Sequence, residues 1–400
     1  MIKIIPDSGS LPLPNPAHND CTKFEQVFAH WLGAPYAFAF WKGRVALYAL
    51  LHALGIGPHD EVILPGYTCV MDVNPIKYLG AQPVYVDIEP ITYNINVDLL
   101  EKKITPHTKA IIAQHTYGYP CALDAIMDIS RRHGIPVVED CCLALGSKYQ
   151  QKKVGTFGLA AYFSFQWNKS FTTGVGGMAT TSDRALAEKI ETLCREKSSP
   201  PPFPSTFMLT LQRLIYRASI FPRTTALATS LFRRLTQKGL VVGSSSAAEF
   251  VPQMPENFFL SMGPAQARAG LRQMKKIEAN FAHRKYMKTL YDNLLKQAGW
   301  PVADIPAHFD PVLVRYPLRV CDKNKVLTQA PSHLVEIGSW FECPLHPLET
   351  PLPLYDYHPG MCPVAQKACA EVVNLPLHPR ANEKTAIKTI RFINKYIPLL

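Results

Sequence analysis

Residues 123–140 read Leu-Asp-Ala-Ile-Met-Asp-Ile-Ser-Arg-Arg-His-Gly-Ile-Pro-Val-Val-Glu-Asp. Over Leu123–His133 the apolar residues recur at spacings of three and four, which predicts an amphipathic helix. The run Pro136–Glu139 is short, largely β-branched and bounded by turn residues, which predicts a buried strand. This helix and strand form one unit of an alternation that extends over residues 36–195.

The same alternation predicts the fold class. Strands are predicted at Val62–Leu64, Pro83–Asp87, Ala110–His115, Pro136–Glu139, Ala160–Phe165 and Gly177–Thr181, and further helices at Val45–Leu54, Cys69–Leu79, Val97–Ile104 and Arg184–Cys194. Strands that alternate with helices favour a mostly parallel sheet with helices on both faces, a three-layer α/β sandwich. Ligands of such sheets bind beyond the carboxyl ends of the strands.

Composition shifts divide the chain into four predicted segments. Residues 1–20 form an N-terminal extension, and 21–197 form the large domain. Residues 198–250 form a basic, amphipathic helical insert. Residues 251–400 hold a long bridging helix, from Gly263 to about Leu295, and a smaller α+β domain that ends in a helix near Glu383–Tyr396.

The 400 residues carry a formal charge of 42 − 31 = +11. Six of the positive charges and no acidic residue lie in 198–248, so the excess is concentrated in the insert. No zinc-finger spacing, RNA-binding string or long basic run is present, which argues against nucleic acid as a partner. We expect the insert to cover the core or a partner subunit. The alternative is contact of residues 205–240 with an anionic membrane.

Cysteine usage bears on metals and on the compartment. None of the ten cysteines forms a CxxC pair or another paired metal-ligand spacing, so no metal site is predicted. The chain shows no signal peptide and no run of 18 apolar residues. We therefore expect a reduced, cytoplasmic protein, peripheral to the inner face of the membrane if the insert binds lipid.

Three groups of residues are candidates for chemistry. Asp140, with Glu139, ends a buried strand where a ligand should lie, although on spacing alone a helix N-cap or a solvated loop acid is favoured. Lys169 follows a strand and could form a Schiff base with an aldehyde, although a lone loop lysine is usually solvated. Ser164 could hold an anionic group close by. Lys42-Gly43-Arg44 begins a helix that could bind phosphate or be an ordinary helix start.

The order of these pieces resembles the DegT/DnrJ/StrS family of nucleotide-sugar aminotransferases, which have the fold type I architecture of pyridoxal-phosphate (PLP) enzymes. The resemblance is strong over residues 24–195 and weaker over 262–400. It is carried by Ala53–Ile63, Gly80–Ile88, Thr105–Ala110, His133–Asp140, Val154–Gly158, Thr172–Met178 and Leu375–Pro379.

The resemblance implies a role for each candidate. Lys169 matches the lysine that forms the Schiff base with PLP and later moves a proton. Asp140 matches the acid that pairs with the pyridinium nitrogen. Ser164, Gly43 and the amide of Arg44 match the phosphate-binding groups.

The sequence departs from the family pattern at several places. Lys42-Gly43-Arg44 replaces Ser-Gly-Thr, so the Arg44 side chain could add a charged contact to the phosphate. Cys69 stands where an aromatic residue often stacks on the cofactor, and Leu143 stands where a polar residue usually contacts cofactor or sugar. Leu159 and Phe259 depart as well.

The function implied is transfer of an amino group from glutamate, through pyridoxamine phosphate, to a nucleotide-linked keto-sugar. The resemblance also implies a homodimer and a role in polysaccharide biosynthesis. Lys169 argues against a sugar dehydratase of the same family, which would carry histidine there. The alternative is a catalytically weak paralogue that binds PLP or a sugar nucleotide for regulation or assembly.

Overall fold

A computed structural model describes residues 19–219, 243, 245, 247–347 and 352–396. The helices are α1 (Asn19–Leu32), α2 (Gly43–Ala53), α3 (Val70–Tyr78), α4 (Val97–Leu100), α5 (Leu123–His133), α6 (Arg184–Lys197), α7 (Phe203–Ser219), α9 (Pro264–Met274), α10 (Ile277–Gln297), α11 (Lys323–Gln329), α12 (Pro363–Glu371) and α13 (Glu383–Tyr396).

The strands are β1 (Tyr36–Phe40), β2 (Glu61–Pro65), β3 (Thr68–Cys69), β4 (Gln82–Val86), β5 (Thr108–Gln114), β6 (Val137–Asp140), β7 (Lys148–Tyr149), β8 (Lys152–Lys153), β9 (Ala160–Ser164), β10 (Gly177–Thr181), β11 (Phe309–Asp310), β12 (Tyr316–Arg319), β13 (Leu345–His346) and β14 (Val372–Leu375). Each of the six predicted strands is present within two residues of its predicted ends.

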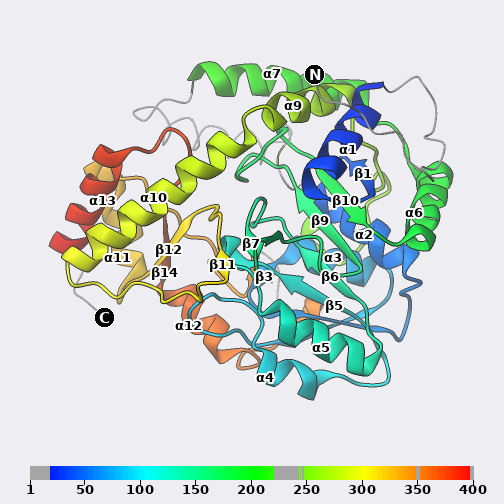
Figure 1. Cartoon of the computed structure of the whole chain (residues 1–400), viewed down its shortest axis with the longest axis horizontal. Helices are drawn as coiled ribbons and strands as arrows, with labels where there is room; N and C mark the ends of the chain where they lie inside the picture. The colour runs from blue at the N-terminus through cyan, green and yellow to red at the C-terminus, as the bar shows by residue number, and fades with distance from the viewer. Residues whose placement is uncertain (1–18, 220–242, 244, 246, 348–351, 397–400) are drawn as a thin grey trace.

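A seven-stranded sheet forms the centre of the molecule (Figure 1), in the order β1-β10-β9-β6-β5-β2-β4. The neighbours from β4 to β9 all pair in parallel, whereas β10 is antiparallel to both β9 and β1. The prediction of a mostly parallel sheet is confirmed. The sequence had not indicated β1, which closes one edge.

Apolar side chains alternate between two cores, one on each face of the sheet. On β6, Val138 packs into the core that contains α2, α3 and α6, and Val137 packs into the core that contains α1 and α5. Tyr162 and Phe163 of β9 separate in the same way. Successive strand residues point to opposite faces, so this alternation produces the predicted three layers.

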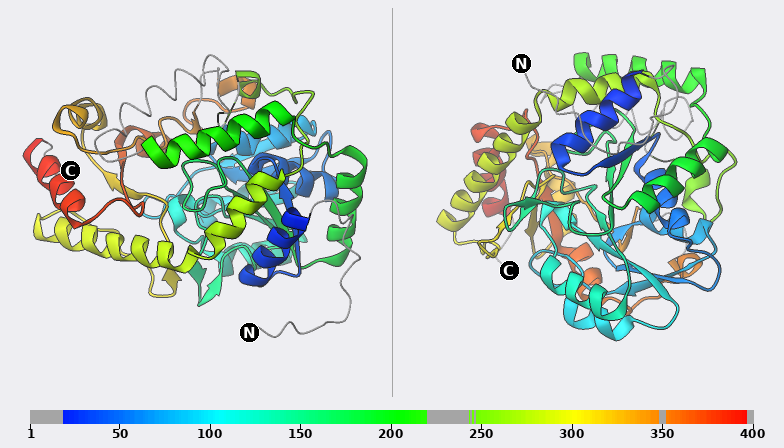
Figure 2. Two further views of the ribbon diagram at one scale, coloured as in Figure 1. Left: turned by 90° about the horizontal axis from the view of Figure 1, so that it is seen from above. Right: turned by 45° about the vertical axis from the view of Figure 1, so that its right-hand side comes forward.

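The second half of the chain forms a smaller α+β unit beside the sheet. There β12 and β14 pair antiparallel, and α10 packs on α13. Figure 2 shows α10 extending from the large sheet toward these elements. The short strand β13 pairs in parallel with β3, which joins the unit to the strand ends of the large sheet.

The long bridging helix predicted from Gly263 is two helices. Helix α9 ends at Met274 and α10 begins at Ile277, with Lys275 and Lys276 between them. Both lysines are good helix formers, so no local signal marks the break. Tertiary packing supplies the reason, because α9 lies against α1, with Gly270 beside the Phe24 ring, while α10 turns toward α13.

The insert is described only in part. Helix α7 confirms the first of its predicted helices and lies beside α9 (Figures 1 and 2), whereas the second, around Leu227–Leu235, lies outside the described residues. Within the described ranges, no helix is long and apolar enough to cross a bilayer. The four-segment division stays a prediction, and α1 begins at Asn19, inside the predicted extension.

Candidate active site

The two acids at the end of β6 point in opposite directions. Asp140 shares a face with Val138, and Glu139 shares the other face with Val137, because side chains alternate along a strand. Glu139 is 0 % exposed and Asp140 is 2 % exposed. Each buried carboxylate therefore needs its own set of partners.

Glu139 is an anchor for the loop that precedes β9. Its Oε2 accepts hydrogen bonds from the Gly155 amide at 2.7 Å and His115 Nε2 at 3.1 Å. Its Oε1 accepts from the amides of Phe157 at 2.7 Å and Gly158 at 2.8 Å. Burial alone would raise the pKa of Glu139, but these hydrogen bonds, led by that of His115, hold it below its usual value. All of its acceptor positions are used, so Glu139 has a structural role.

His115, Glu139 and Cys141 lie close enough together to suggest a metal site, with potential ligand atoms within 4.8 Å of one another. However, His115 Nδ1 accepts a hydrogen bond from the Cys121 amide at 3.0 Å. In the neutral imidazole the proton is then on Nε2, which donates to Glu139. Hydrogen bonding satisfies this cluster without a cation.

Asp140 and Lys169 come together at the carboxyl ends of the strands. Asp140 Oδ1 accepts from the Cys142 amide at 2.8 Å. Lys169 follows β9 in a turn, where its amide donates to Gln166 at 3.1 Å. Lys169 Nζ lies 4.8 Å from the centre of the Trp340 ring, which comes from the smaller unit. In the part of the chain that the structure describes, neither Asp140 nor Lys169 forms an ion pair, although Asp140 is buried.

A third acid, Asp72 of α3, lies in the same place. It receives a hydrogen bond from the Tyr162 hydroxyl on β9, and both Asp140 and Lys169 act electrostatically on it. Sequence reasoning missed Asp72 because it lies within the helical pattern of residues 69–79, although an acid in so apolar a run was a signal. Trp340 carried no signal at all, since its position depends on the docking of β13 against β3.

The start of α2 and the end of β9 form a narrow cradle. A Cβ on Gly43 would lie 2.9 Å from the Ser164 Cβ, so only glycine allows this approach. Gly43 and Arg44 are the first two residues of α2, and amides at that position have no partner within the helix. With the Ser164 hydroxyl beside them, they form a set of donors suited to a phosphate.

The side chains of Lys42 and Arg44 are engaged elsewhere. Arg44 Nη1 lies 2.7 Å from Glu249 Oε1, and Lys42 Nζ lies 2.9 Å from Glu249 Oε2. Burial and the neighbouring Arg44 lower the pKa of Lys42, and Glu249 opposes that shift. The buried Arg44 and the partly buried Lys42 require an anion, and Glu249 supplies it. The expected charged contact of Arg44 is therefore made to Glu249, which leaves its backbone amide for the cradle.

Cys69 and Leu143 place uncharged side chains at two of the predicted site positions. Cys69 ends β3, opposite His346 of β13. Burial, reinforced by Asp72, raises the pKa of Cys69 to about 12, so the thiol stays neutral. Leu143 is 5 % exposed and packs in the core, where it offers no polar contact.

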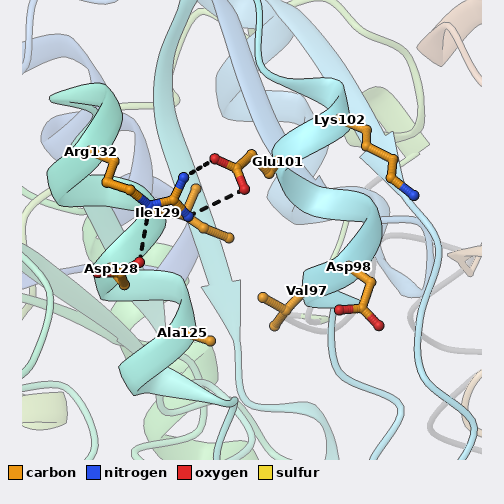
Figure 3. Close-up of a pocket in the computed structure, with 8 residues that line it drawn as sticks. All are labelled: Val97, Asp98, Glu101, Lys102, Ala125, Asp128, Ile129 and Arg132. Carbon is orange, nitrogen blue, oxygen red and sulfur yellow. Dashed lines mark hydrogen bonds and ion pairs between the residues drawn. The ribbon is translucent and has the colours of Figure 1, made fainter.

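A groove between α4 and α5 lies apart from these residues (Figure 3). Arg132 reaches from α5 to Glu101 and also binds Asp128, and hydrogen bonds from Arg132 and His133 lower the pKa of Glu101 to about 2. The groove is lined by none of the predicted site residues. Arg132, Glu101 and Asp128 thus pair with one another on an exposed surface.

The site can hold a compound with an aldehyde, a basic ring nitrogen and a phosphate. Lys169 offers an amine, Asp140 offers a buried carboxylate with no cationic partner among the described residues, and the cradle offers phosphate donors. These are the groups that PLP requires, so the residues present fit that cofactor.

Comparisons with known proteins agree with this assignment. GDP-perosamine synthase of Caulobacter vibrioides is 46 % identical over 178 residues, which are 44 % of this chain and 48 % of the relative. The chain spans about half the length of the first curated relatives it matches.

Two solved structures share the architecture of nearly the whole chain. The aminotransferase TlmJ from Streptoalloteichus hindustanus is 25 % identical, with a TM-score of 0.72 over 94 % of this chain and 90 % of that one. The putative sugar aminotransferase Spr1654 from Streptococcus pneumoniae, in its PLP form, is 21 % identical, with a TM-score of 0.73 over 94 % and 91 %. The fold is thus that of fold type I PLP aminotransferases.

The match to a family description covers most of the sequence. The DegT/DnrJ/EryC1/StrS aminotransferase family matches residues 17–204 and 232–393, which include all of the candidate site residues. The chain therefore belongs to the DegT/DnrJ/EryC1/StrS aminotransferase family.

Proposed function

We propose that the chain is a PLP-dependent aminotransferase that moves an amino group from glutamate to a nucleotide-linked keto-sugar. The observation that carries this proposal is the meeting of Lys169 and Asp140 at the strand ends, each without an ion-pair partner among the described residues. A buried carboxyl group in that condition is suited to a cationic ligand, and a protonated ring nitrogen is one.

Each candidate residue has a separate role toward the cofactor. The amides of Gly43 and Arg44 and the Ser164 hydroxyl would bind the phosphate. Asp140 would accept a hydrogen bond from the ring nitrogen and keep it protonated. Lys169, whose Nζ lies 4.8 Å from the centre of the Trp340 ring, would supply the amine for the aldehyde and would carry a proton. When bound, the cofactor supplies an electron sink for amino-group transfer.

The substrate class follows from the relatives. GDP-perosamine synthase is named for a GDP-linked amino sugar, which supports a GDP-linked keto-sugar as the acceptor. Glutamate is the proposed amino donor. The product would be an amino-sugar nucleotide, the kind of precursor that polysaccharide biosynthesis consumes.

Absorbance spectroscopy tests the proposal. Purified protein with added PLP should show a visible band that glutamate bleaches, and mass spectrometry should then detect amination of a GDP-linked keto-sugar. Lys169→Ala should abolish the band. The control Lys102→Ala, at an exposed lysine in the turn after α4, should retain it. A wild-type protein that shows no band, or one that glutamate does not change, would overturn the proposal.

We also propose a homodimer in a reducing compartment. All ten cysteines are free, which suits the cytoplasm. Phe203, Phe207 and Leu214 on α7 are 79 %, 60 % and 61 % exposed and form an apolar surface that a partner or a membrane could cover. Light scattering of the full chain tests the dimer.

Membrane contact through residues 205–240 is the further proposal for the insert. Its positive charge and the exposed apolar residues of α7 support binding to anionic lipid. Flotation with anionic liposomes should be lost in Phe203→Ser/Phe207→Ser. Equal flotation of this variant and the wild type would contradict membrane contact through α7.

A further inference from the structure

Asp72 lies at the meeting point of three elements. It belongs to α3, it is 9 % exposed, and its Oδ1 accepts a hydrogen bond from the Tyr162 hydroxyl at 3.0 Å. Its Oδ2 lies 3.2 Å from Thr68 Oγ1, on β3. A buried acid has to be either ionised and fully supplied with donors or neutral and able to donate. The neighbours of Oδ2 decide between these two states.

Gln114 of β5 sets the direction of hydrogen bonding at Thr68. One terminal atom of its amide lies 2.9 Å from the Tyr67 carbonyl oxygen, which can only accept. That atom is therefore the nitrogen, and it also reaches Thr116 Oγ1 at 2.9 Å. The other atom is the amide oxygen, which can only accept, and it lies 2.5 Å from Thr68 Oγ1.

The hydroxyl of Thr68 has a single hydrogen, which can be donated to Gln114 or to Asp72 but not to both. Two oxygens at 2.5 Å need a hydrogen between them, so Thr68 donates to Gln114. Thr68 then presents only lone pairs to Asp72 Oδ2. The 3.2 Å contact is favourable only if Asp72 carries the hydrogen there and donates it to Thr68.

The charges around Asp72 favour the same state. Burial, reinforced by the Asp140 carboxylate, raises the pKa of Asp72 to about 7 against the opposing effects of Lys169 and the Tyr162 hydroxyl. The other titratable neighbours are the thiols of Cys69 and Cys142. Burial raises the pKa of both, so these thiols stay neutral and bring no charge to the side of Asp72.

We propose that Asp72 is a positioning acid that works in its neutral form, donating a hydrogen bond to Thr68, so that Asp140 is the single carboxylate of the pair left for a cationic ligand. The line Asp72–Thr68–Gln114 then fixes β3 against β5 beside Lys169. The link to the ring nitrogen rests on the proposed function. The protonation state of Asp72 is a property of the chain alone.

The substitution Asp72→Asn mimics the proposed state. Its amide oxygen can accept from Tyr162 and its amide nitrogen can donate to Thr68, so we expect the full-length variant to fold. Unfolding by urea is measured between pH 5 and 8 without added cofactor. Asp304→Asn, at an exposed acid, is the matched control.

The sign of the expected pH dependence follows from proton binding. Between the ordinary Asp pKa of 3.8 and about 7, the native wild type keeps a proton that its unfolded chain has lost, so rising pH destabilises it. Asp72→Asn lacks this effect. Its folded-to-unfolded ratio relative to the wild type should therefore grow by up to about tenfold per pH unit. A ratio that stays constant from pH 5 to 8 would overturn the proposal.

Two further measurements keep the proposal testable if Asp72→Asn does not fold. Tyr162→Phe removes a hydrogen bond that lowers the pKa of Asp72, so the pH dependence should move to higher pH. Infrared difference spectra at pH 6, wild type minus a variant at position 72, should show the carbonyl stretch of a protonated acid. The absence of this difference band would contradict the assignment. Because no cofactor is added, failure here and failure of the absorbance test are separate outcomes.

Discussion

Substituting Glu139 by Gln changes one atom of the side chain and should cost much of the fold's stability. Glu139 accepts four hydrogen bonds, two at each oxygen, from Gly155, Phe157, Gly158 and His115. The Gln amide keeps one oxygen, but its NH2 group faces two donors. His115 cannot change its tautomer to help, because its Nδ1 is occupied by the Cys121 amide.

The magnitude follows from the two hydrogen bonds that are lost. A hydrogen bond to a charged group contributes about 1.5–3 kcal/mol, so Glu139→Gln should lower the free energy of unfolding by about 3–6 kcal/mol. Whole domains have only about 5–15 kcal/mol. Urea unfolding followed by circular dichroism measures the change. The matched control is Glu188→Gln, at an exposed residue of α6 that pairs with Arg184, with an expected loss below about 1 kcal/mol.

The pH dependence gives a second check on the same residue. The pKa of Glu139 is held below its usual value of 4.5, so its stabilising contribution is present above that pH and is lost as the pH falls. The difference between wild type and Glu139→Gln should shrink in acid. A loss of less than about 1 kcal/mol at pH 7, or a difference that widens in acid, would refute the hydrogen-bond assignment.

Three other substitutions test the cradle and the site. Gly177→Ala places a Cβ 2.5 Å from the Gly43 Cα, so the start of α2 must move, and we expect a lower melting temperature and weaker binding of PLP by fluorescence titration. Lys169→Ala should abolish transaminase activity but leave the melting temperature within a few degrees, because Lys169 forms no ion pair among the described residues; a collapse in stability would show a structural role. Glu249→Gln leaves Lys42 and Arg44 without their carboxylate and should cost about 3–5 kcal/mol in urea unfolding. A variant as stable as the wild type would mean that another group neutralises the two cations.

The large sheet could be predicted because its signals are local. Leu123–His133 has three- and four-residue spacing along its whole length, and α5 has the predicted bounds. Gly177–Thr181 was likewise predicted with the bounds of β10. Neither the break at Lys275–Lys276 nor the strand β1 has such a signal, since one depends on where α9 and α10 pack and the other on an antiparallel partner distant in sequence.

The positions of Asp140 and Lys169 could be predicted from the sequence, whereas the contacts of the residues around them could not. Asp140 and Lys169 each follow a strand, and the carboxyl ends of parallel strands meet, so their neighbourhood follows from the order of the elements. The engagement of Arg44 with Glu249 could not be read from the sequence, because those residues are brought together by packing across 205 positions. The sequence marked Asp140 only through the family resemblance, and the structure adds the physical reason, because the Asp140 side chain shares a face with Val138 whereas that of Glu139 shares the other face with Val137.

The Trp340 ring above Lys169 comes from a part of the chain that is synthesised long after the lysine. A nascent chain that has completed β9 carries Lys169 without this ring, which arrives only with the segment that pairs β13 with β3. The site is therefore completed late in synthesis. A fragment that ends with the large sheet would keep Asp140 and Lys169 but lack the aromatic ring beside the amine.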